Sequence, residues 1–406
     1  MDHTTGLKRN VTVYYISNAL SGLLFTIPVW VAFHQQYLDY SQLAFIAGLS
    51  YFVTLILELP TGALADLIGR KRTIIIGQVL IGVFRIFLGF SFAPWMFYVA
   101  WLGEAAGNAF VSGADKALLY DSLKECGDEK KFPGIVAKSS LVRRALMVAA
   151  VLSGGYLYQY FEGLPFILRG LAYMVMAIVS VFLIEPDVES YKFTLKNYTR
   201  QAKKGFIHLL RTPYLKSLTA YYTVVVGIIW VCQDYFVNTF AKDSGYTEKE
   251  QSWVFASLYL ISTLVVLFLT RNESKIMNKK LLYVSMAAIL IVSLVPGYYA
   301  SKLVVYFLIF GLNLTSAMQR ALLDNYVNEE LESKYRATAM SGLNLLVSGV
   351  YMAVLFISGP FQDEYSNRFV WSALGIAAVL LLVPLTTLLL SRLKAKEEAD
   401  RDIITR

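Results

Sequence analysis

The chain has 406 residues, of which 56% are hydrophobic and only 16% are charged. Soluble domains carry about 25% charged residues, so this composition excludes a cytosolic enzyme, a nucleic-acid-binding protein and a disordered chain. The net charge is +8, and the two cysteines, Cys126 and Cys232, lack the spacing of a metal site or a disulfide framework. The sequence therefore predicts a membrane protein without a metal or organic cofactor.

Long, largely uncharged runs recur along the whole chain, and each is close to the 20 or so residues that a bilayer-spanning helix needs. They predict an all-α polytopic membrane protein with twelve transmembrane helices joined by mostly short connections. In chain order the predicted spans are 11–35, 42–65, 73–91, 95–120, 137–159, 165–184, 215–240, 250–270, 280–299, 303–326, 337–359 and 367–391.

Lysine and arginine are distributed unevenly over the connections between these spans. One alternating set of loops, together with both chain ends, holds most of the 37 basic residues, whereas the other set holds Lys242, Lys249, Lys302 and Arg368. Because basic loops stay inside the cell, we expect a cytoplasmic (inner) membrane protein with both termini in the cytoplasm. The positive charge then reflects topology and anionic lipid headgroups, and we expect no nucleic-acid partner.

The connection between the second and third spans has a distinctive pattern. Residues 58–72 read ELPTGALADLIGRKR, which resembles the signature loop G-x-L-A-D-x-x-G-R-[KR] of the major facilitator superfamily. Residues 336–341 (RATAMS) resemble a turn of its drug-exporting branches, and residues 113–121 (GADKALLYD) resemble the end of the fourth helix in bacterial members. Together with the span count, the resemblance covers essentially the whole chain and implies a transporter with two six-helix bundles.

The residues of this loop also have a physical interpretation. Gly62 allows close helix packing, and Gly69 permits a tight turn between helices. Asp66 suits the N-terminus of a facing helix, for which the eleventh span is the expected partner. Arg70 is expected to pair with Asp121 at the end of the fourth span. The resemblance implies that such contacts latch a cytoplasmic gate, and we assign that role to these five residues.

The third and fourth spans carry ionisable side chains within the predicted bilayer. Such a residue costs about 2.5–3.5 kcal/mol on insertion scales, so it should face the bundle interior. From the helical rise, Arg85 lies about 9 Å and Glu104 about 13 Å from the outer ends of their spans. The two form either a permanent structural pair or a site where Glu104 exchanges arginine for a proton. The proton-coupling candidates are Glu104, then Asp115 and Asp234, with Arg85 as the partner.

Polar residues recur at helical spacing on the first, fourth, seventh and tenth spans. On the fourth span they predict one polar stripe, formed by Glu104, Asn108, Ser112 and Asp115. The family resemblance implies that these four spans line a central cavity. The candidate substrate-binding residues are Tyr14, Asn18, Asn108, Ser112, Tyr222, Trp230, Gln233, Asn313 and Arg320. The aromatic members suit an aromatic or cationic substrate, although packing between helices is the alternative.

A longer connection divides the spans into two sets of six, and the sets repeat. Residues 116–121 (KALLYD) and 320–325 (RALLDN) end the fourth and tenth spans at an offset of 204 residues. Such duplication predicts two pseudo-symmetric halves related by an axis along the membrane normal. The expected parts are an N-terminal bundle at 1–184, a cytoplasmic linker at 185–214, a C-terminal bundle at 215–391 and a cytoplasmic tail at 392–406.

These features predict a secondary active transporter that moves a small, amphipathic or drug-like molecule by alternating access, with proton-coupled efflux as the main expectation. An importer or facilitator of a nutrient has the same architecture and stays open as the alternative. The sequence lacks an H-E-x-x-H motif, a G-x-S-x-G motif and a phosphate-binding glycine loop, so we do not expect an enzyme. We expect a monomer in the lipid bilayer, with a small-molecule substrate and a proton as coupling ion.

Overall fold

The computed structural model describes residues 3–187, 205–271 and 278–404. Within these ranges the chain forms α-helices, short 3-10 and π segments and connecting turns, and it has no strand. The prediction of an all-α chain is therefore confirmed. Much of the predicted linker and the last residues of the tail lie outside the described residues.

The described residues fall into two compact units. One unit is drawn from Met1–Thr194 and Thr247–Tyr259, and the other from Leu195–Tyr246 and Leu260–Arg406. The sequence-based division placed the whole eighth span in the second half. In the structure, the first part of the corresponding helix, α12 (Glu248–Arg271), packs with the first unit.

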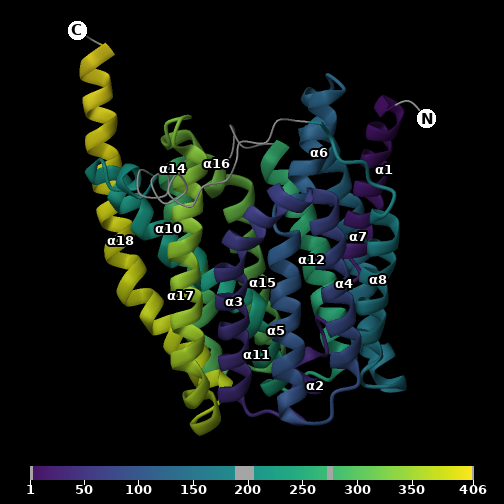
Figure 1. The fold of residues 1–406 in the computed structure, drawn as a ribbon. Helices are drawn as coiled ribbons and strands as arrows, with labels where there is room; N and C mark the ends of the chain where they lie inside the picture. Colours follow the sequence, from purple (N-terminus) through teal and green to yellow (C-terminus); the bar gives the residue numbers. More distant parts are fainter. Residues whose placement is uncertain (1–2, 188–204, 272–277, 405–406) are drawn as a thin grey trace. The chain divides into compact units, whose positions relative to one another are not determined.

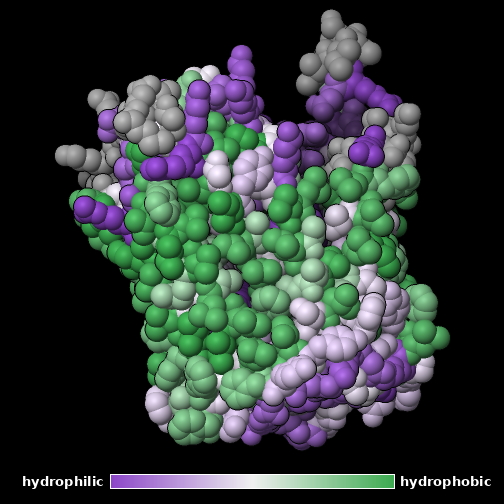
Figure 2. Space-filling view, turned by 90° about the vertical axis from the view of Figure 1, so that its right-hand side faces the viewer, coloured by the Kyte–Doolittle hydropathy of each residue, from purple (hydrophilic) through white to green (hydrophobic). Residues whose placement is uncertain are grey.

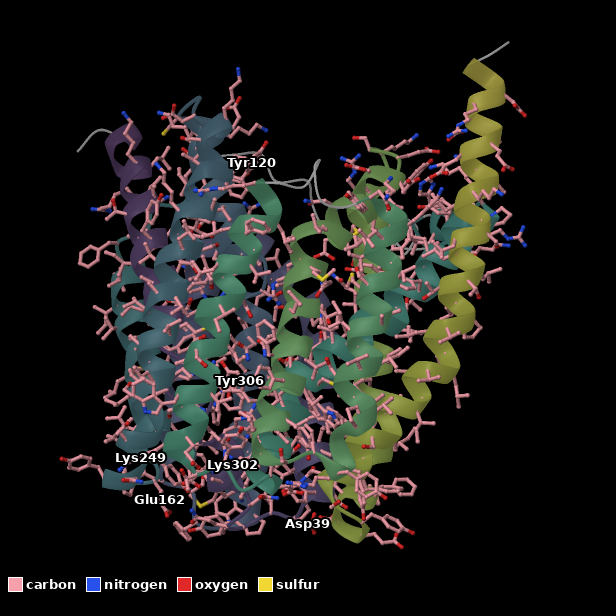
Figure 3. The ribbon with its side chains drawn as sticks, turned by 180° about the vertical axis from the view of Figure 1, so that it is seen from behind. Asp39, Tyr120, Glu162, Lys249, Lys302 and Tyr306 are labelled. Atoms are coloured by element: carbon pink, nitrogen blue, oxygen red, sulfur yellow. The ribbon has the colours of Figure 1, made fainter. Side chains whose placement is uncertain are left out.

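The long helices of the first unit run side by side (Figure 1). Tyr120 lies toward one end of this unit, and Asp39, Glu162 and Lys249 lie toward the opposite end (Figure 3). We call these the Tyr120 end and the Glu162 end. The elements before α12 are α1 (His3–Ser21), α2 (Trp30–His34), α3 (Tyr40–Ile68), α4 (Arg70–Gly89), α5 (Pro94–Val111), α6 (Ala114–Glu125), the 3-10 turn η1 (Glu129–Lys131), α7 (Phe132–Tyr160) and α8 (Leu164–Ser180).

The second unit contains two π-helical segments within otherwise regular helices. Its elements, besides the rest of α12, are α10 (Pro213–Val231), the π segment η2 (Cys232–Phe236), α11 (Val237–Asp243), α14 (Lys279–Leu294), the 3-10 segment η3 (Val295–Tyr299), α15 (Lys302–Met318), the π segment η4 (Gln319–Leu323), α16 (Asp324–Glu330), α17 (Arg336–Glu364) and α18 (Asn367–Ile404). Both π segments fall on spans that the sequence predicts to line a cavity.

Eight helical stretches among the described residues are long and apolar enough to cross a membrane. On the face shown in Figure 2, hydrophobic residues form a broad band between two more hydrophilic ends. Each of the twelve predicted spans coincides with helical segments, but four do not reach the length and apolarity of a single spanning helix. The first and fourth spans are interrupted, the helix of the fifth carries Lys138, Arg143 and Arg144, and α8 has 17 residues. The count of twelve therefore stays a prediction.

Helix α4 packs between α5 and α8 through pairs of glycines. In each pair, a Cβ atom added to either glycine would meet the carbonyl oxygen of the other. The pairs are Gly77 with Gly107, Gly82 with Gly170, and Gly89 with Gly163. Glycines without side chains let helix backbones approach closely, which is a common mode of packing in membranes. The three helices are therefore in direct backbone contact.

The first part of α12 packs on α7 at another glycine. The Gly155 N–H donates to the Ser252 hydroxyl at 2.8 Å, and a Cβ atom on Gly155 would collide with the Glu248 carbonyl. The Trp253 indole N–H donates to the Tyr156 hydroxyl at 2.9 Å. These contacts explain why the beginning of α12 belongs to the first unit.

A buried histidine fixes α2 against α5 near the Glu162 end. His34 is fully buried among aromatic rings that include Phe97 and Phe166. The Trp101 indole N–H donates to His34 Nε2 at 2.8 Å. Because Nε2 accepts, Nδ1 carries the proton and donates to the Trp30 carbonyl at 2.6 Å. Both ring nitrogens are satisfied, so His34 has a structural role.

Candidate functional site

The ion pair predicted between the third and fourth spans is present inside the first unit. The Arg85 guanidinium on α4 contacts the Glu104 carboxylate on α5, and the two side chains are 14% and 11% exposed. Arg169 on α8 lies close enough to interact electrostatically with both, and it donates to the Thr26 hydroxyl at 3.1 Å. We call these three residues the Arg85–Glu104–Arg169 cluster. It holds two cations for one anion, which the sequence analysis did not predict.

A cavity of about 120 Å³ lies inside the first unit between α1, α4, α5, α6 and α8. Four residues predicted from the sequence meet on its wall, namely Tyr14, Asn18, Asn108 and Asp115. The wall also contains Ser21 and polar residues that were not predicted from the sequence, which are Asn10, Ser17, Gln78, Tyr173 and Ser180. Gln78 lies on α4, Tyr173 and Ser180 lie on α8, and Asn10 and Ser17 lie within α1. The cavity wall is thus mixed, with polar side chains and one carboxylate beside apolar residues such as Val13, Ile81 and Leu118.

Asn10 organises the cavity at the Tyr120 end, although nothing in its sequence neighbourhood indicated this role. Its side chain is fully buried and donates to the Ser122 hydroxyl at 2.8 Å and to the Ile184 carbonyl at 2.7 Å. Its amide oxygen accepts from the Ile184 N–H at 2.9 Å. A single amide therefore joins α1 to α6 and to the residues after α8.

The fourth span is not one helix, so the prediction of a continuous polar stripe along it is wrong beyond Asn108. Helix α5 ends at Val111, and Gly113 adopts a left-handed conformation (φ +77°) before α6 begins. The break turns Ser112 away from the cavity, and its hydroxyl donates to Glu58 Oε1 on α3 at 2.8 Å. Asp115 returns to the cavity wall on α6.

A second polar group lies in the second unit around Asp324 of α16. The Tyr222 hydroxyl on α10 donates to Asp324 Oδ1 at 3.0 Å, and the Gln319 side-chain amide donates to the same oxygen at 3.2 Å. On the next residue along the π segment, the Arg320 guanidinium donates to the Ser316 hydroxyl at 2.6 Å. Tyr222 and Arg320 were predicted site residues, and the structure places both beside polar partners.

The remaining candidates of the second unit do not converge on one described cavity. Asn313 is buried and donates to the Ile309 carbonyl of its own helix at 3.0 Å. Trp230 is half-buried, and Asp234 in the π segment η2 is exposed. The Gln233 side-chain nitrogen is buried without a hydrogen-bond partner among the described residues. Because π segments often occur at functional sites, Gln233 and Asp234 stay candidates.

The predicted gate residues lie at the Tyr120 end. Arg70 forms an ion pair with Asp121, as the sequence predicts. Gly69 has a φ of +94°, a conformation that favours glycine, and it links α3 to α4. Glu185 accepts from the backbone N–H groups of Arg70 and Lys71 at 2.7 and 2.8 Å, which caps the positive end of α4. Glu185 was not among the predicted residues, because it follows the sixth span in the predicted linker.

Two other gate candidates, Gly62 and Asp66, lie on α3, but their side chains are outside the described part of the structure. The predicted contact of Asp66 with the eleventh span therefore stays a prediction. The described part of the gate consists of Gly69, Arg70 and Asp121, together with Glu185.

Comparison with known proteins agrees with these features. The chain is 24% identical over 402 residues to the transporter YxaM of Bacillus subtilis, with 92% of this chain and 94% of the relative covered. It is 21% identical to Multidrug resistance protein 2 of Bacillus subtilis over 80% of this chain and 82% of that protein. Its fold is similar to the crystal structure of the nucleoside transporter NupG, with a TM-score of 0.71, 12% identity and coverage of 96% and 99%. The family model of the Major Facilitator Superfamily matches residues 11–353. The chain therefore belongs to the major facilitator superfamily of membrane transporters.

Proposed function

We propose that this transporter exports a small amphipathic or drug-like molecule in exchange for protons. The observation that carries the proposal is the buried Arg85–Glu104–Arg169 cluster, because an ionisable group inside a membrane bundle marks a functional site unless it is needed for packing. Two relatives of the chain are named multidrug resistance proteins, which supports export as the direction. Import of a nutrient is the alternative outcome of the experiment below.

In the proposed cycle, Glu104 alternates between its arginine partner and a proton. The Arg85 guanidinium contacts the Glu104 carboxylate, and Arg169 lies nearby. A conformational change that moves either arginine therefore changes the proton affinity of Glu104. Asp115 on the cavity wall and the exposed Asp234 are the further candidates for proton transfer.

The substrate is proposed to contact the aromatic and polar residues predicted from the sequence. In the first unit, Tyr14, Asn18 and Asn108 share one cavity wall. In the second unit, Tyr222 and Arg320 present hydroxyl and guanidinium groups near Asp324. Aromatic rings beside hydrogen-bonding groups suit a molecule with an apolar body and a polar or cationic end.

The pair of Arg70 and Asp121 is proposed to latch the transporter at its cytoplasmic end. Arg70→Asp is expected to reduce the transport rate at least tenfold, since two acidic side chains then face each other. The double variant Arg70→Asp with Asp121→Arg should regain most of the activity because it restores the opposite charges. Rates are measured in vesicles at matched protein levels. Arg72→Asp, an exposed change two residues away, is the control, and a double variant as inactive as the single one would contradict the latch.

Everted membrane vesicles test the proposed direction and coupling. Acidifying the vesicle lumen should drive accumulation of a lipophilic fluorescent cation, because the cytoplasmic face of an exporter is then outside. Vesicles without the protein provide the control for passive entry. Accumulation in whole cells together with none in everted vesicles would instead identify an importer.

The same vesicles test the proposed location of both termini in the cytoplasm. Native Cys126 follows α6 and is half-buried, whereas Cys232 is buried. An impermeant thiol reagent should therefore label Cys126 in everted vesicles but not in right-side-out vesicles, with Cys126→Ser as the control. The reverse pattern would contradict the orientation predicted from the basic residues.

A further inference from the structure

The cavity of the first unit contains buried oxygens whose hydrogen bonds the protein does not satisfy. Gln78 Oε1, Ser17 Oγ and Ser180 Oγ have no partner among the described residues. Gln78 is 2% exposed and Ser180 is 1% exposed, and all three residues line the cavity. Buried polar atoms are nearly always paired with protein or with ordered water. These atoms therefore require water inside the cavity.

The cavity is large enough to meet that requirement. One water needs about 10–15 Å³ measured with a water-sized probe, together with two to four polar partners. The volume of about 120 Å³ thus accommodates several waters in contact with one another. The amide, hydroxyl and carboxylate groups on the wall supply the partners. A ligand that filled the cavity without polar groups would leave these oxygens unsatisfied.

The ion cluster lies close to the cavity along three helices. Each member of the Arg85–Glu104–Arg169 cluster lies four residues from a residue of the same helix that lines the cavity. The pairs are Arg85 with Ile81 on α4, Glu104 with Asn108 on α5, and Arg169 with Tyr173 on α8. A separation of four residues places two side chains on one face of a helix, about 6 Å apart along its axis. The cluster therefore lies one helical turn beyond the cavity on three helices at once.

The cluster also offers groups that water can contact. The Nε atoms of Arg85 and Arg169 are buried without a hydrogen-bond partner among the described residues. Both donors belong to the two guanidinium groups beside Glu104. Waters that extend from the cavity by one helical turn can accept from these donors, which joins the cavity and the cluster into one polar column.

The opposite end of the column reaches toward the Tyr120 end of the unit. Asp115 lies on the cavity wall, five residues before Tyr120 on α6. The charged and titratable groups around Asp115 are Lys116 on its own helix, Arg143 on α7 and Tyr14 on α1. The Asp115 carboxylate accepts from the Lys116 N–H at 2.7 Å. A carboxylate at this position is able to pass protons between the surface and the waters.

We propose that this cavity is filled with water and is the route by which protons travel between Asp115 and the Arg85–Glu104 pair, within one unit. A proton binds to Glu104 when Arg85 releases that carboxylate, passes along the waters to the Asp115 carboxylate, and leaves from there toward the cytoplasm. The proposal rests on the proposed proton coupling, and it gives that coupling a path whose wall includes Tyr14, Asn18 and Asn108 of the proposed substrate site. Gln78, Ser17 and Ser180 are the residues that hold the waters.

Cysteine labelling tests the hydration of the cavity without reference to transport. In a protein with Cys126 and Cys232 replaced by serine, Gln78→Cys and Ser180→Cys should react with 2-aminoethyl methanethiosulfonate at least tenfold faster than Val151→Cys. Val151 is fully buried on α7 and does not line the cavity. Equal rates for the cavity positions and the control would overturn the proposal, because a thiol in a dry cavity stays protonated and unreactive.

Blocking the cavity tests its use as a proton route. Gln78→Leu should slow proton-driven transport at least tenfold in everted vesicles while substrate exchange without a proton gradient persists. Gln78→Asn keeps an amide and is the matched control. If Gln78→Leu does not fold, Ser180→Val with Ser180→Thr as its control replaces it. A normal rate of proton-driven transport in the folded Gln78→Leu variant would overturn the proton route through the cavity. If the unmodified protein shows no proton-driven transport, the proposed function itself is wrong. The cysteine labelling then still decides whether the cavity contains water.

Discussion

Glu104→Gln is expected to destabilise the protein by about 3–5 kcal/mol, because it leaves the buried Arg85 guanidinium without its carboxylate partner and removes a nearby anion from Arg169. Arg85→Gln is expected to cost less, since Glu104 then keeps Arg169 as a cationic neighbour. The order of the two effects follows from the two-to-one charge ratio of the cluster. Thermal unfolding of the purified protein in detergent measures the difference, and the Glu104 variant should have the lowest melting temperature.

Glu58→Gln is the matched control for this prediction, because Glu58 is an exposed glutamate on the neighbouring helix α3 and glutamine keeps the oxygen that accepts from Ser112. Its substitution should change stability by no more than about 0.5 kcal/mol. An Arg85→Gln variant that is less stable than Glu104→Gln would contradict the inference that the cluster holds an excess of positive charge. The Glu104 variant should also lose proton-driven accumulation if it is the coupling residue.

Gly107→Leu is expected to prevent the first unit from folding. A Cβ atom at this position already lies 2.9 Å from the Gly77 carbonyl oxygen and 2.9 Å from the Ile81 backbone nitrogen. Overpacking of a core costs about 1–3 kcal/mol when side chains are able to shift, and here the obstacle is backbone on another helix. The fraction of tagged protein that elutes as a single monodisperse peak in size-exclusion chromatography measures the effect.

Gly349→Leu provides the comparison for that experiment. Gly349 lies in α17, is exposed, and has no atom within 4 Å of an added Cβ. The same substitution should therefore leave the yield of folded protein close to that of the unmodified chain. Equal losses at both positions would contradict the view that backbone contact, rather than the loss of glycine itself, makes Gly107 necessary.

Several features were predictable because they depend on local rules. The spans follow from runs of apolar residues, and the pairing of Arg85 with Glu104 follows from the constant rise of a helix and the cost of an unpaired charge in lipid. The pair of Arg70 and Asp121 follows from the signature loop and from the antiparallel course of the neighbouring helices. Each of these inferences needs only the sequence and one geometric constant.

Other features were not predictable because they depend on packing. Glycine is common in membrane helices, so Gly113 did not reveal the break that separates α5 from α6. The π segments η2 and η4 arise inside runs whose sequences are ordinary for helices. Glu185 and Asn10 act on backbone groups that are distant in sequence, and no spacing rule connects them.

The glycine contacts of α4 have a consequence for how the transporter moves. Helices that touch through backbone atoms lack side chains that are able to repack, so α4, α5 and α8 should behave as a rigid block during the transport cycle. Arg85, Glu104 and Arg169 each belong to one of these three helices. The axes of these three helices therefore keep a fixed spacing. Proton binding by Glu104 must then be controlled by rotation of the side chains, by water and by the surrounding helices, and not by movement of α4, α5 and α8 away from one another.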